Sequence, residues 1–253
     1  MKKLVITVAL LCVLVLLCVP VMARTYTVSG TDISVEIDDS QWYVFTRDNI
    51  RNNAELDELG LTYEYMNTTM RSNNIYLDAV LFFDESDYVE LFVVKEKTDS
   101  SEQIANLSKQ PNSRVEKLAK EAQAEGNLDF CEVYKNDYTF LEIANSDIGL
   151  YLCSYVTVIN QEMYTLKFQS TVPYTTENVE YLRQIVDSVS FDVDPALDPK
   201  DSFFDTVLGK ALIGAAIGAV IGGVIGVISS KKKKAQKEQQ AQQTQWPPQY
   251  PMQ

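Results

Sequence analysis

One stretch near the C-terminal end limits most strongly how this chain can be arranged. Residues 207–229 are apolar or small apart from Lys210, and the 18 residues from 211 to 228 are all apolar or glycine. A helix of that length spans about 27 Å, close to the roughly 30 Å of a bilayer's hydrocarbon core, and Lys210 can reach toward the headgroups. The sequence therefore predicts one transmembrane helix over residues 207–229.

Basic residues at both ends of the chain orient this span. Four lysines, 231–234, follow it directly and mark the cytoplasmic side. At the other end, Lys2 and Lys3 precede an apolar run and a small-residue pattern ending at Ala23, so residues 1–23 are predicted to be a cleaved signal peptide. A retained signal anchor and lipid attachment at Cys18 remain open as alternatives. Whether the signal is cleaved or retained, residues 24–205 lie outside, and the protein is expected at the cell membrane as a single-pass protein.

Composition divides the rest of the chain. Residues 24–191 have the length and apolar content of one extracytoplasmic domain, and residues 192–206, with their prolines and aspartates, are expected to be an acidic juxtamembrane linker. The tail, residues 230–253, is basic and then rich in Gln and Pro. Such a composition cannot form a core, so a disordered cytoplasmic tail is predicted.

Charge follows the same division. Between residues 24 and 205 there are 34 acidic and 14 basic side chains, whereas the remaining residues carry a net positive charge. A domain this acidic repels phosphate backbones and anionic lipid surfaces. Nucleic-acid binding is therefore disfavoured.

The hydrophobic periodicity indicates an α+β fold. The first strand candidates are residues 25–29 and residues 33–37. In the second of these, Ile33, Val35 and Ile37 alternate with polar side chains, and residues 42–46 are expected to continue the same sheet. A helical segment at residues 53–71 is expected to break near Gly60, with Thr62 as N-cap of its second part. The further predicted elements are a hairpin (75–83 and 88–96), a helix from Ser113 to Gly126, a meander (128–135, 138–144, 150–159 and 162–171), a helix capped by Thr175 or Thr176, and a last strand at 188–191.

In residues 150–159 both alternating sets of side chains are largely apolar, which is typical of a strand covered on both faces. We therefore expect an antiparallel sheet sandwiched by helices, followed by one transmembrane helix. The opening ISVEIDDSQWYVFT and the closing segment that ends in IVDSVSF resemble the PsbP/DcrB-like fold. That resemblance covers roughly residues 25–192 and implies a binding or accessory module more often than an enzyme, without fixing a ligand.

Catalytic chemistry is restricted by composition. The chain has no histidine, so Ser-His and Cys-His nucleophilic sites and His-based metal sites cannot be built. No phosphate-binding glycine loop occurs, and we predict no catalytic residue, no cofactor and no metal. The interpretation favoured by the sequence is a non-enzymatic binding or accessory module for an unknown extracytoplasmic protein or ligand. The alternatives are a membrane scaffold or signalling protein that self-associates through its span and, more remotely, a surface hydrolase that uses paired carboxylates.

Cys131 and Cys153 are the cysteines left after signal removal, in a compartment that permits disulfides. Counting from the predicted turns places Cys131 opposite about Glu142, and Glu142 opposite about Cys153. The two cysteines would then lie two strands apart, roughly 9 to 10 Å, which exceeds the ~7 Å limit between bridged Cα atoms. Free thiols are favoured, and a bridge requires a different strand order.

The predicted span carries a stripe of small residues, since Gly214, Gly218, Gly222 and Gly226 recur every four residues. Close backbone approach through such a face is the main source of attraction between helices in lipid, so we expect a homo-oligomer through the span. Replacing Gly218 and Gly222 with Ile should abolish energy transfer between labelled copies of the isolated span in detergent. Equal transfer in the wild-type and doubly substituted spans would show that the stripe reflects composition alone.

Overall fold

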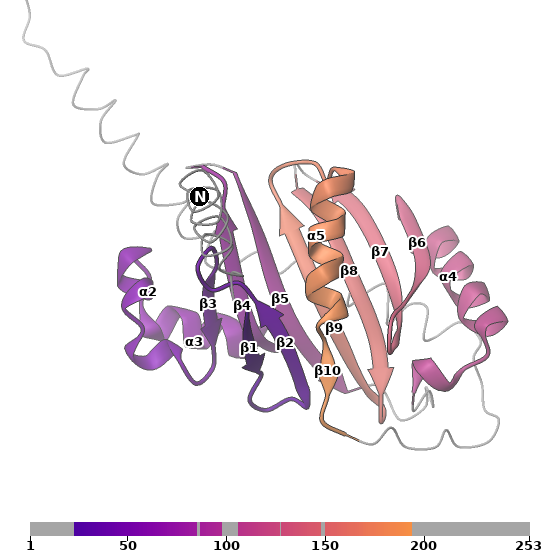
Figure 1. The fold of residues 1–253 in the computed structure, drawn as a ribbon, viewed down its shortest axis with the longest axis horizontal. Coiled ribbons are helices and arrows are strands. Elements are labelled where there is room, and N and C mark those ends of the chain that lie inside the picture. The colour runs from indigo at the N-terminus through magenta and orange to yellow at the C-terminus, as the bar shows by residue number, and fades with distance from the viewer. Residues whose placement is uncertain (1–22, 85–86, 98–105, 127, 148–149, 194–253) are drawn as a thin grey trace, which may run out of the picture.

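The computed structural model describes residues 23–84, 87–97, 106–126, 128–147 and 150–193. The predicted signal peptide, the predicted membrane span with Gly214, Gly218, Gly222 and Gly226, and the predicted tail lie outside these residues. Among the residues described, no helix is long and apolar enough to cross a bilayer. The described part is an α+β domain with two antiparallel sheets, as Figure 1 shows.

The larger sheet has seven strands in the order β3-β4-β5-β9-β8-β7-β6. The predicted hairpin and the predicted meander are both present, and pairing of β5 with β9 joins them into one sheet. The strands are β3 (Tyr43–Thr46), β4 (Ile75–Phe82), β5 (Tyr88–Lys97), β6 (Phe130–Lys135), β7 (Thr139–Asp147), β8 (Leu150–Ile159) and β9 (Glu162–Ser170).

The smaller sheet consists of β1 (Arg24–Thr27), β2 (Ile33–Ile37) and β10 (Ser190–Phe191), with β2 in the middle. The expectation that residues 42–46 continue the sheet of residues 33–37 is wrong, because β3 belongs to the larger sheet. The reason lies in the turn between them, where the backbone N–H groups of Gln41 and Trp42 both donate to the carbonyl of Asp38. This turn carries the chain across to β4, with which β3 pairs.

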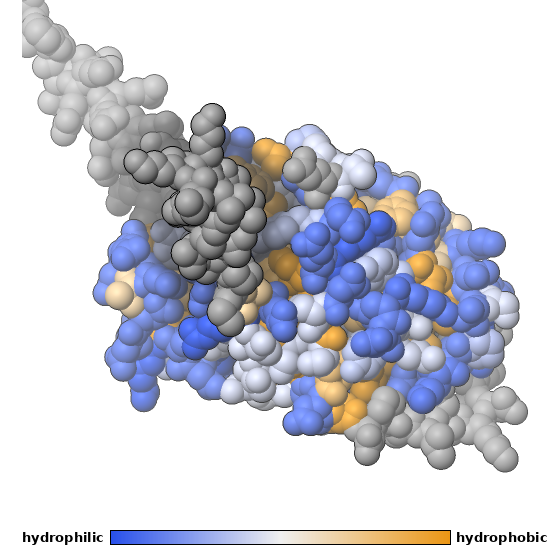
Figure 2. Space-filling model, viewed as in Figure 1, coloured by the Kyte–Doolittle hydropathy of each residue, from blue (hydrophilic) through white to orange (hydrophobic). Residues whose placement is uncertain are grey.

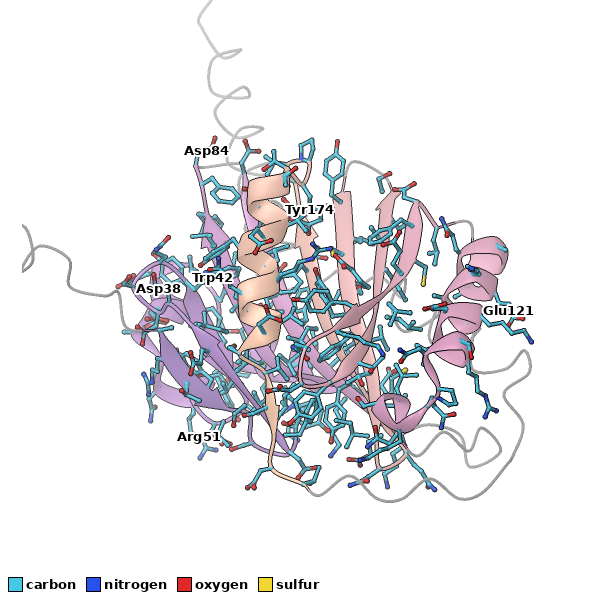
Figure 3. The ribbon with its side chains drawn as sticks, turned by 45° about the vertical axis from the view of Figure 1, so that its right-hand side comes forward. Asp38, Trp42, Arg51, Asp84, Glu121 and Tyr174 are labelled. Carbon is cyan, nitrogen blue, oxygen red and sulfur yellow. The ribbon has the colours of Figure 1, made fainter. Side chains whose placement is uncertain are left out.

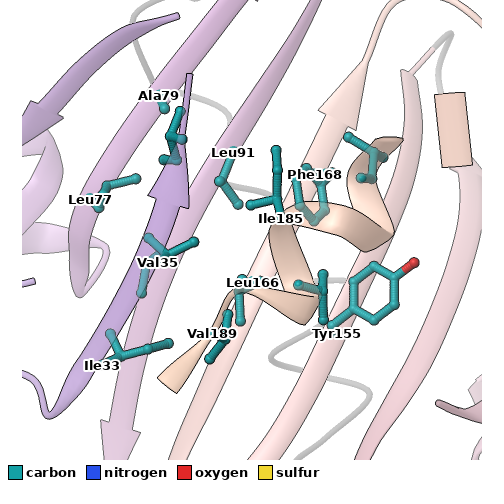
Figure 4. Close-up of a cluster of buried hydrophobic side chains, with 14 of the residues drawn as sticks. Ile33, Val35, Leu77, Ala79, Leu91, Tyr155, Leu166, Phe168, Ile185 and Val189 are labelled. Atoms are coloured by element: carbon teal, nitrogen blue, oxygen red, sulfur yellow. The ribbon is translucent and has the colours of Figure 1, made fainter. Parts of the chain in front are cut away.

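The smaller sheet and α5 (Thr176–Asp187) together cover one face of the larger sheet, which we call the front face. Figure 4 shows the core between these layers, where Val35 from β2 and Ile185 from α5 meet Leu91 and Phe168 from the larger sheet. Thr175 caps α5 as predicted, since its hydroxyl accepts from the backbone N–H of Asn178. The front cover thus joins the first and last described elements of the chain.

Helices alone cover the opposite face, which we call the back face. At one end lie η1 (Ile50–Asn52), α2 (Ala54–Glu58) and α3 (Tyr63–Ser72), and at the other end lie η2 (Leu107–Lys109) and α4 (Asn112–Gly126). The predicted break near Gly60 and the Thr62 cap of α3 are both observed. The helix predicted to begin at Ser113 begins one residue earlier, at Asn112, because the carbonyl of Pro111 accepts from the backbone N–H groups of Arg114 and Val115.

The edge strand β3 is protected by a side chain. The amide of Asn49 donates to the carbonyl of Val44 at 2.9 Å, and its oxygen accepts from the N–H of Thr46 at 2.7 Å. Asn49 therefore takes the hydrogen bonds that a further strand would make. Blocking an edge in this way opposes pairing with another chain.

Cys131 and Cys153 are free and buried. Their strands are separated by β7, as predicted, but the register differs from the prediction by one residue for Cys131, which pairs with Ile143, and by two for Cys153, which pairs with Ala144. Because neighbouring residues of a strand point to opposite faces, this register places Cys131 in the back core and Cys153 in the front core. The sheet itself separates the two thiols.

We predict that both thiols stay unbridged without reductant. Burial raises the pKa of each thiol to about 12, so neither forms a reactive thiolate near neutral pH in the folded protein. A maleimide added to the native protein should leave both cysteines unlabelled, whereas labelling in denaturant should modify both, as mapped by peptide mass spectrometry. A disulfide-linked peptide pair containing Cys131 and Cys153 would contradict this arrangement.

Candidate functional site

An apolar pocket opens on the front face beside α5, and we call it the Trp42 pocket. Its volume is about 240 Å³, and none of its described lining residues carries a charge. The lining consists of Gln41, Trp42, Leu81, Phe83, Val89, Asn178 and Tyr181. Three separate segments therefore meet here: the turn before β3, the ends of β4 and β5, and the first turns of α5.

The alternation of β4 explains why this part of the front face is open. Leu77 and Ala79 lie in the closed front core, whereas Leu81 is only half-buried, and Phe83 continues the same alternation beyond the strand. Leu81 pairs with Val89, so the floor of the pocket is apolar. From α5, the polar Asn178 and the aromatic Tyr181 line this part of the pocket. The apolar face of the β4 and β5 hairpin thus extends beyond the part that α5 and the smaller sheet cover.

Trp42 forms the inner wall. Its side chain is only 3% exposed, and its indole N–H donates to the hydroxyl of Tyr181 at 2.9 Å. This hydrogen bond joins the turn before β3 to α5 and fixes the indole plane. Trp42 is therefore both a core residue and a pocket residue, and Figure 3 shows it beside α5.

Phe83 forms the outer wall and is 52% exposed. Among the described residues it is the large hydrophobic side chain that stands out by its exposure. Its backbone N–H donates to the carbonyl of Asp87 at 2.8 Å, which holds the residue at the end of the hairpin. Figure 2 shows apolar side chains reaching the surface in small separate patches within a largely hydrophilic face.

Carboxylates stand next to several of the residues that line the pocket. Asp38 accepts from the side-chain amide of Gln41 at 2.7 Å, Asp84 follows Phe83, and Glu180 precedes Tyr181. Asp84 and Glu180 are exposed. Hydrogen bonds from the hydroxyl and backbone N–H of Ser40, and from Gln41, lower the pKa of Asp38 despite opposing desolvation. The rim is therefore negatively charged at neutral pH.

Two other hollows are more polar. One of about 380 Å³ lies beside Asp32 and Asp192, and one of about 320 Å³ lies between η1 and α2. Asp32 accepts from the hydroxyl of Tyr164 at 3.2 Å and lies 3.6 Å from the amine of Lys95. Its carboxylate serves the packing of β9 and β5 against the smaller sheet.

Ionisable side chains are also buried at the centre of the back face, between the helices at its two ends. Asp78, Glu90 and Lys167 are at most 1% exposed, and the amide of Gln169 donates to Glu90. Asp78 and Lys167 both pair with Phe92, which places them on the same face. Burial lowers the pKa of Lys167 to about 8. None of the three lines a pocket described above, so the Trp42 pocket is the better candidate for binding.

Sequence reasoning identified part of this site. A Trp on an alternating strand is more often a core residue than a groove residue, and Trp42 is both, whereas no motif in the sequence singles out Phe83 or Tyr181. The available signal was the apolar alternation that runs through Leu81 to Phe83 into an acidic turn. The predicted association residues Gly214, Gly218, Gly222 and Gly226 lie outside the described residues.

Comparison with known proteins shows a similarity of this chain to a solved structure. No family model matches the chain, and no curated protein matches it. The chain is similar to the solution structure of cyanobacterial PsbP (CyanoP) from Synechocystis sp. PCC 6803, with 11% identity and a TM-score of 0.39 over 69% of this chain and 95% of that chain. This neighbour is a PsbP protein, as the resemblance in the sequence indicated, and the likeness concerns the fold only.

We predict that the cost of burying Lys167 depends on pH. Its amine loses its proton near pH 8 when folded and near pH 10.5 when unfolded, so between these values the unfolded state binds more protons and stability rises with pH. Relative to a Lys167→Met variant, the wild type should gain about 2 kcal/mol in free energy of unfolding between about pH 7.5 and 9.5.

Urea unfolding followed by Trp42 fluorescence measures this difference. The control is Lys120→Met on α4, because Lys120 is exposed and its replacement should leave the pH dependence unchanged. A constant difference between the wild type and Lys167→Met across this range would show that Lys167 keeps its ordinary pKa in the folded protein.

Proposed function

We propose that this protein is a single-pass, membrane-anchored binding or accessory module whose extracytoplasmic domain holds a partner through the Trp42 pocket. The observation that carries the proposal is an open apolar pocket next to a half-exposed aromatic side chain, Phe83, on an otherwise hydrophilic face. Exposed apolar surface of this kind costs free energy in water and is relieved when a partner covers it.

The size of the pocket favours a side chain of a larger partner over a free small molecule. Pockets for drug-sized ligands usually measure about 300 to 1,000 Å³, and the Trp42 pocket is smaller. Aromatic side chains that line a desolvated pocket typically supply much of the binding energy at protein interfaces. Trp42, Phe83 and Tyr181 provide such a lining, and Trp42 is already held by its hydrogen bond.

The position of the pocket suits capture away from the membrane. The chain leaves the domain after β10, where the N–H of Asp192 donates to the carbonyl of Asp32 at one end of β2, at the bottom of Figure 1. Trp42 follows the turn at the other end of β2. In this proposal residues 207–229 cross the membrane, the signal peptide 1–23 directs the domain outside, and the 13 residues 194–206 allow a reach of up to about 45 Å. The pocket then faces away from the anchor.

Pairing of spans through Gly214, Gly218, Gly222 and Gly226 forms part of the same proposal. It would place two or more domains side by side on the membrane surface. The binding function does not depend on it, because every described lining residue of the pocket comes from one chain.

Photo-crosslinking in intact cells tests the binding function. The full chain is expressed with p-benzoylphenylalanine in place of Phe83 or, as a control, in place of Glu121 on α4, whose side chain is 44% exposed and which Figure 3 shows on the far side of the molecule. Irradiation should give a discrete adduct from position 83 and none from position 121. An added Asn178→Phe substitution, which fills the pocket from α5, should reduce the adduct several-fold because the anchor site is occupied.

Equal adducts from both positions would mean that position 83 meets proteins only by collision. An adduct that Asn178→Phe leaves unchanged would mean that the partner does not enter the pocket. Either result contradicts the proposal. Far-ultraviolet circular dichroism of the purified variants confirms that the fold is retained.

A further inference from the structure

The charge around the Trp42 pocket indicates the chemistry of what it binds. We infer that the pocket receives one aromatic or large aliphatic side chain from a basic segment of a partner protein. This inference rests on the proposed function and adds the class of ligand to it.

The apolar part of the ligand follows from the lining. None of the described residues around the cavity is charged, and the aromatic groups come from three elements: Trp42 before β3, Phe83 after β4 and Tyr181 on α5. The side-chain amides of Gln41 and Asn178 are the polar groups at the margin. An ionised group placed inside would lose water without gaining a counter-charge, so the inserted group must be apolar.

The basic part follows from the rim. Asp38, Asp84 and Glu180 come from the three elements that build the pocket, so a segment lying across it meets carboxylates on several sides. Asp39 and Asp87 stand in the same two turns, and of these Asp39 lies 3.7 Å from Arg24. Arg183, two residues after Tyr181, is engaged elsewhere, because it donates to Glu142 on β7 at 2.8 Å. The charge offered to a ligand is therefore negative.

Charge also argues against a second copy of this chain as the occupant. Phe83 of one copy entering the pocket of another would bring the rim carboxylates of both copies together. Residues 24–205 carry 34 acidic against 14 basic side chains, so the approach of two such domains is repulsive. A basic segment is attracted by the same field and is steered toward the pocket.

Peptide selection tests the inference. The full chain in phosphatidylcholine nanodiscs is the target for phage that display short random peptides, with counter-selection against a Phe83→Ser variant. Because Phe83 is 52% exposed, this variant should keep the fold. The enriched peptides should carry one Phe, Trp, Leu or Met flanked by Lys or Arg. In a Trp246→Phe background, a selected peptide should change the fluorescence of Trp42.

Rim variants then measure the role of charge. Asp84→Asn with Glu180→Gln should weaken the selected peptide by about three- to ten-fold at low salt, and the difference should shrink as salt is added. The matched control is Glu116→Gln with Glu121→Gln, which removes two charges from α4 on the far side of the molecule, one from the exposed Glu116 and one from the partly exposed Glu121. This control should change the affinity by less than about two-fold.

The outcomes separate this inference from the proposed function. Enrichment of apolar peptides without basic residues overturns the inference and leaves pocket binding in place. Failure to enrich any peptide that depends on Phe83 overturns both. Sedimentation showing dimers that Phe83→Ser dissociates would identify a second copy as the occupant and overturn the basic partner.

Discussion

The requirement to cover both apolar faces of the seven-stranded sheet determines the rest of this structure. Leu91 and Phe92 are neighbours in β5, point to opposite faces, and are both fully buried. Burial of such side chains contributes about 1.5 to 3 kcal/mol each, so neither face can be left to water. The back face is covered by helices from the middle of the chain. The front face is covered by β2 and α5, and the N–H of Glu36 donates to the hydroxyl of Ser188 across 152 residues of sequence. The front cover therefore exists only when both ends of the domain are in place.

The Trp42 pocket forms where the front cover of β2 and α5 ends above the β4 and β5 hairpin. A helix that starts at Thr176 cannot cover the whole length of the β4 and β5 hairpin, and the first turns of α5 present Asn178 where the core would require an apolar residue. Trp42 closes the inner side because its hydrogen bond to Tyr181 fixes the end of the front layer. A larger apolar residue at position 178 would complete the core. The site is thus a local gap in the packing between α5 and the hairpin of β4 and β5.

The sequence predicted the helices and strands better than it predicted which strands pair with each other. Alternation located β2, β4 and β8, and the caps at Thr62 and Thr175 were visible because a cap is a local interaction. Pairing is not local. Nothing in residues 33–46 shows that the turn after Asp38 sends β3 to another sheet. The predicted register between β6 and β7 was wrong by one residue, so the prediction placed Cys131 on the opposite face of the sheet from the one it occupies. Lys167 is similar, since a lysine in an alternating strand normally indicates a solvated face. Here β9 lies at the centre of the sheet, with both faces buried.

The positions of the acidic side chains indicate which of them can act on a partner. Asp38, Asp39, Asp84 and Asp87 stand in turns at the pocket end, whereas the buried acids on the back face are hidden from any partner. In the arrangement proposed above, pairing of the predicted spans through their glycines would bring the domains close, and their like charges would oppose contact between one pocket rim and another. Association in the membrane and binding outside it would then not compete for the same surface. The negative rim keeps the apolar pocket away from copies of itself and from anionic lipid, and leaves it accessible to a partner of opposite charge.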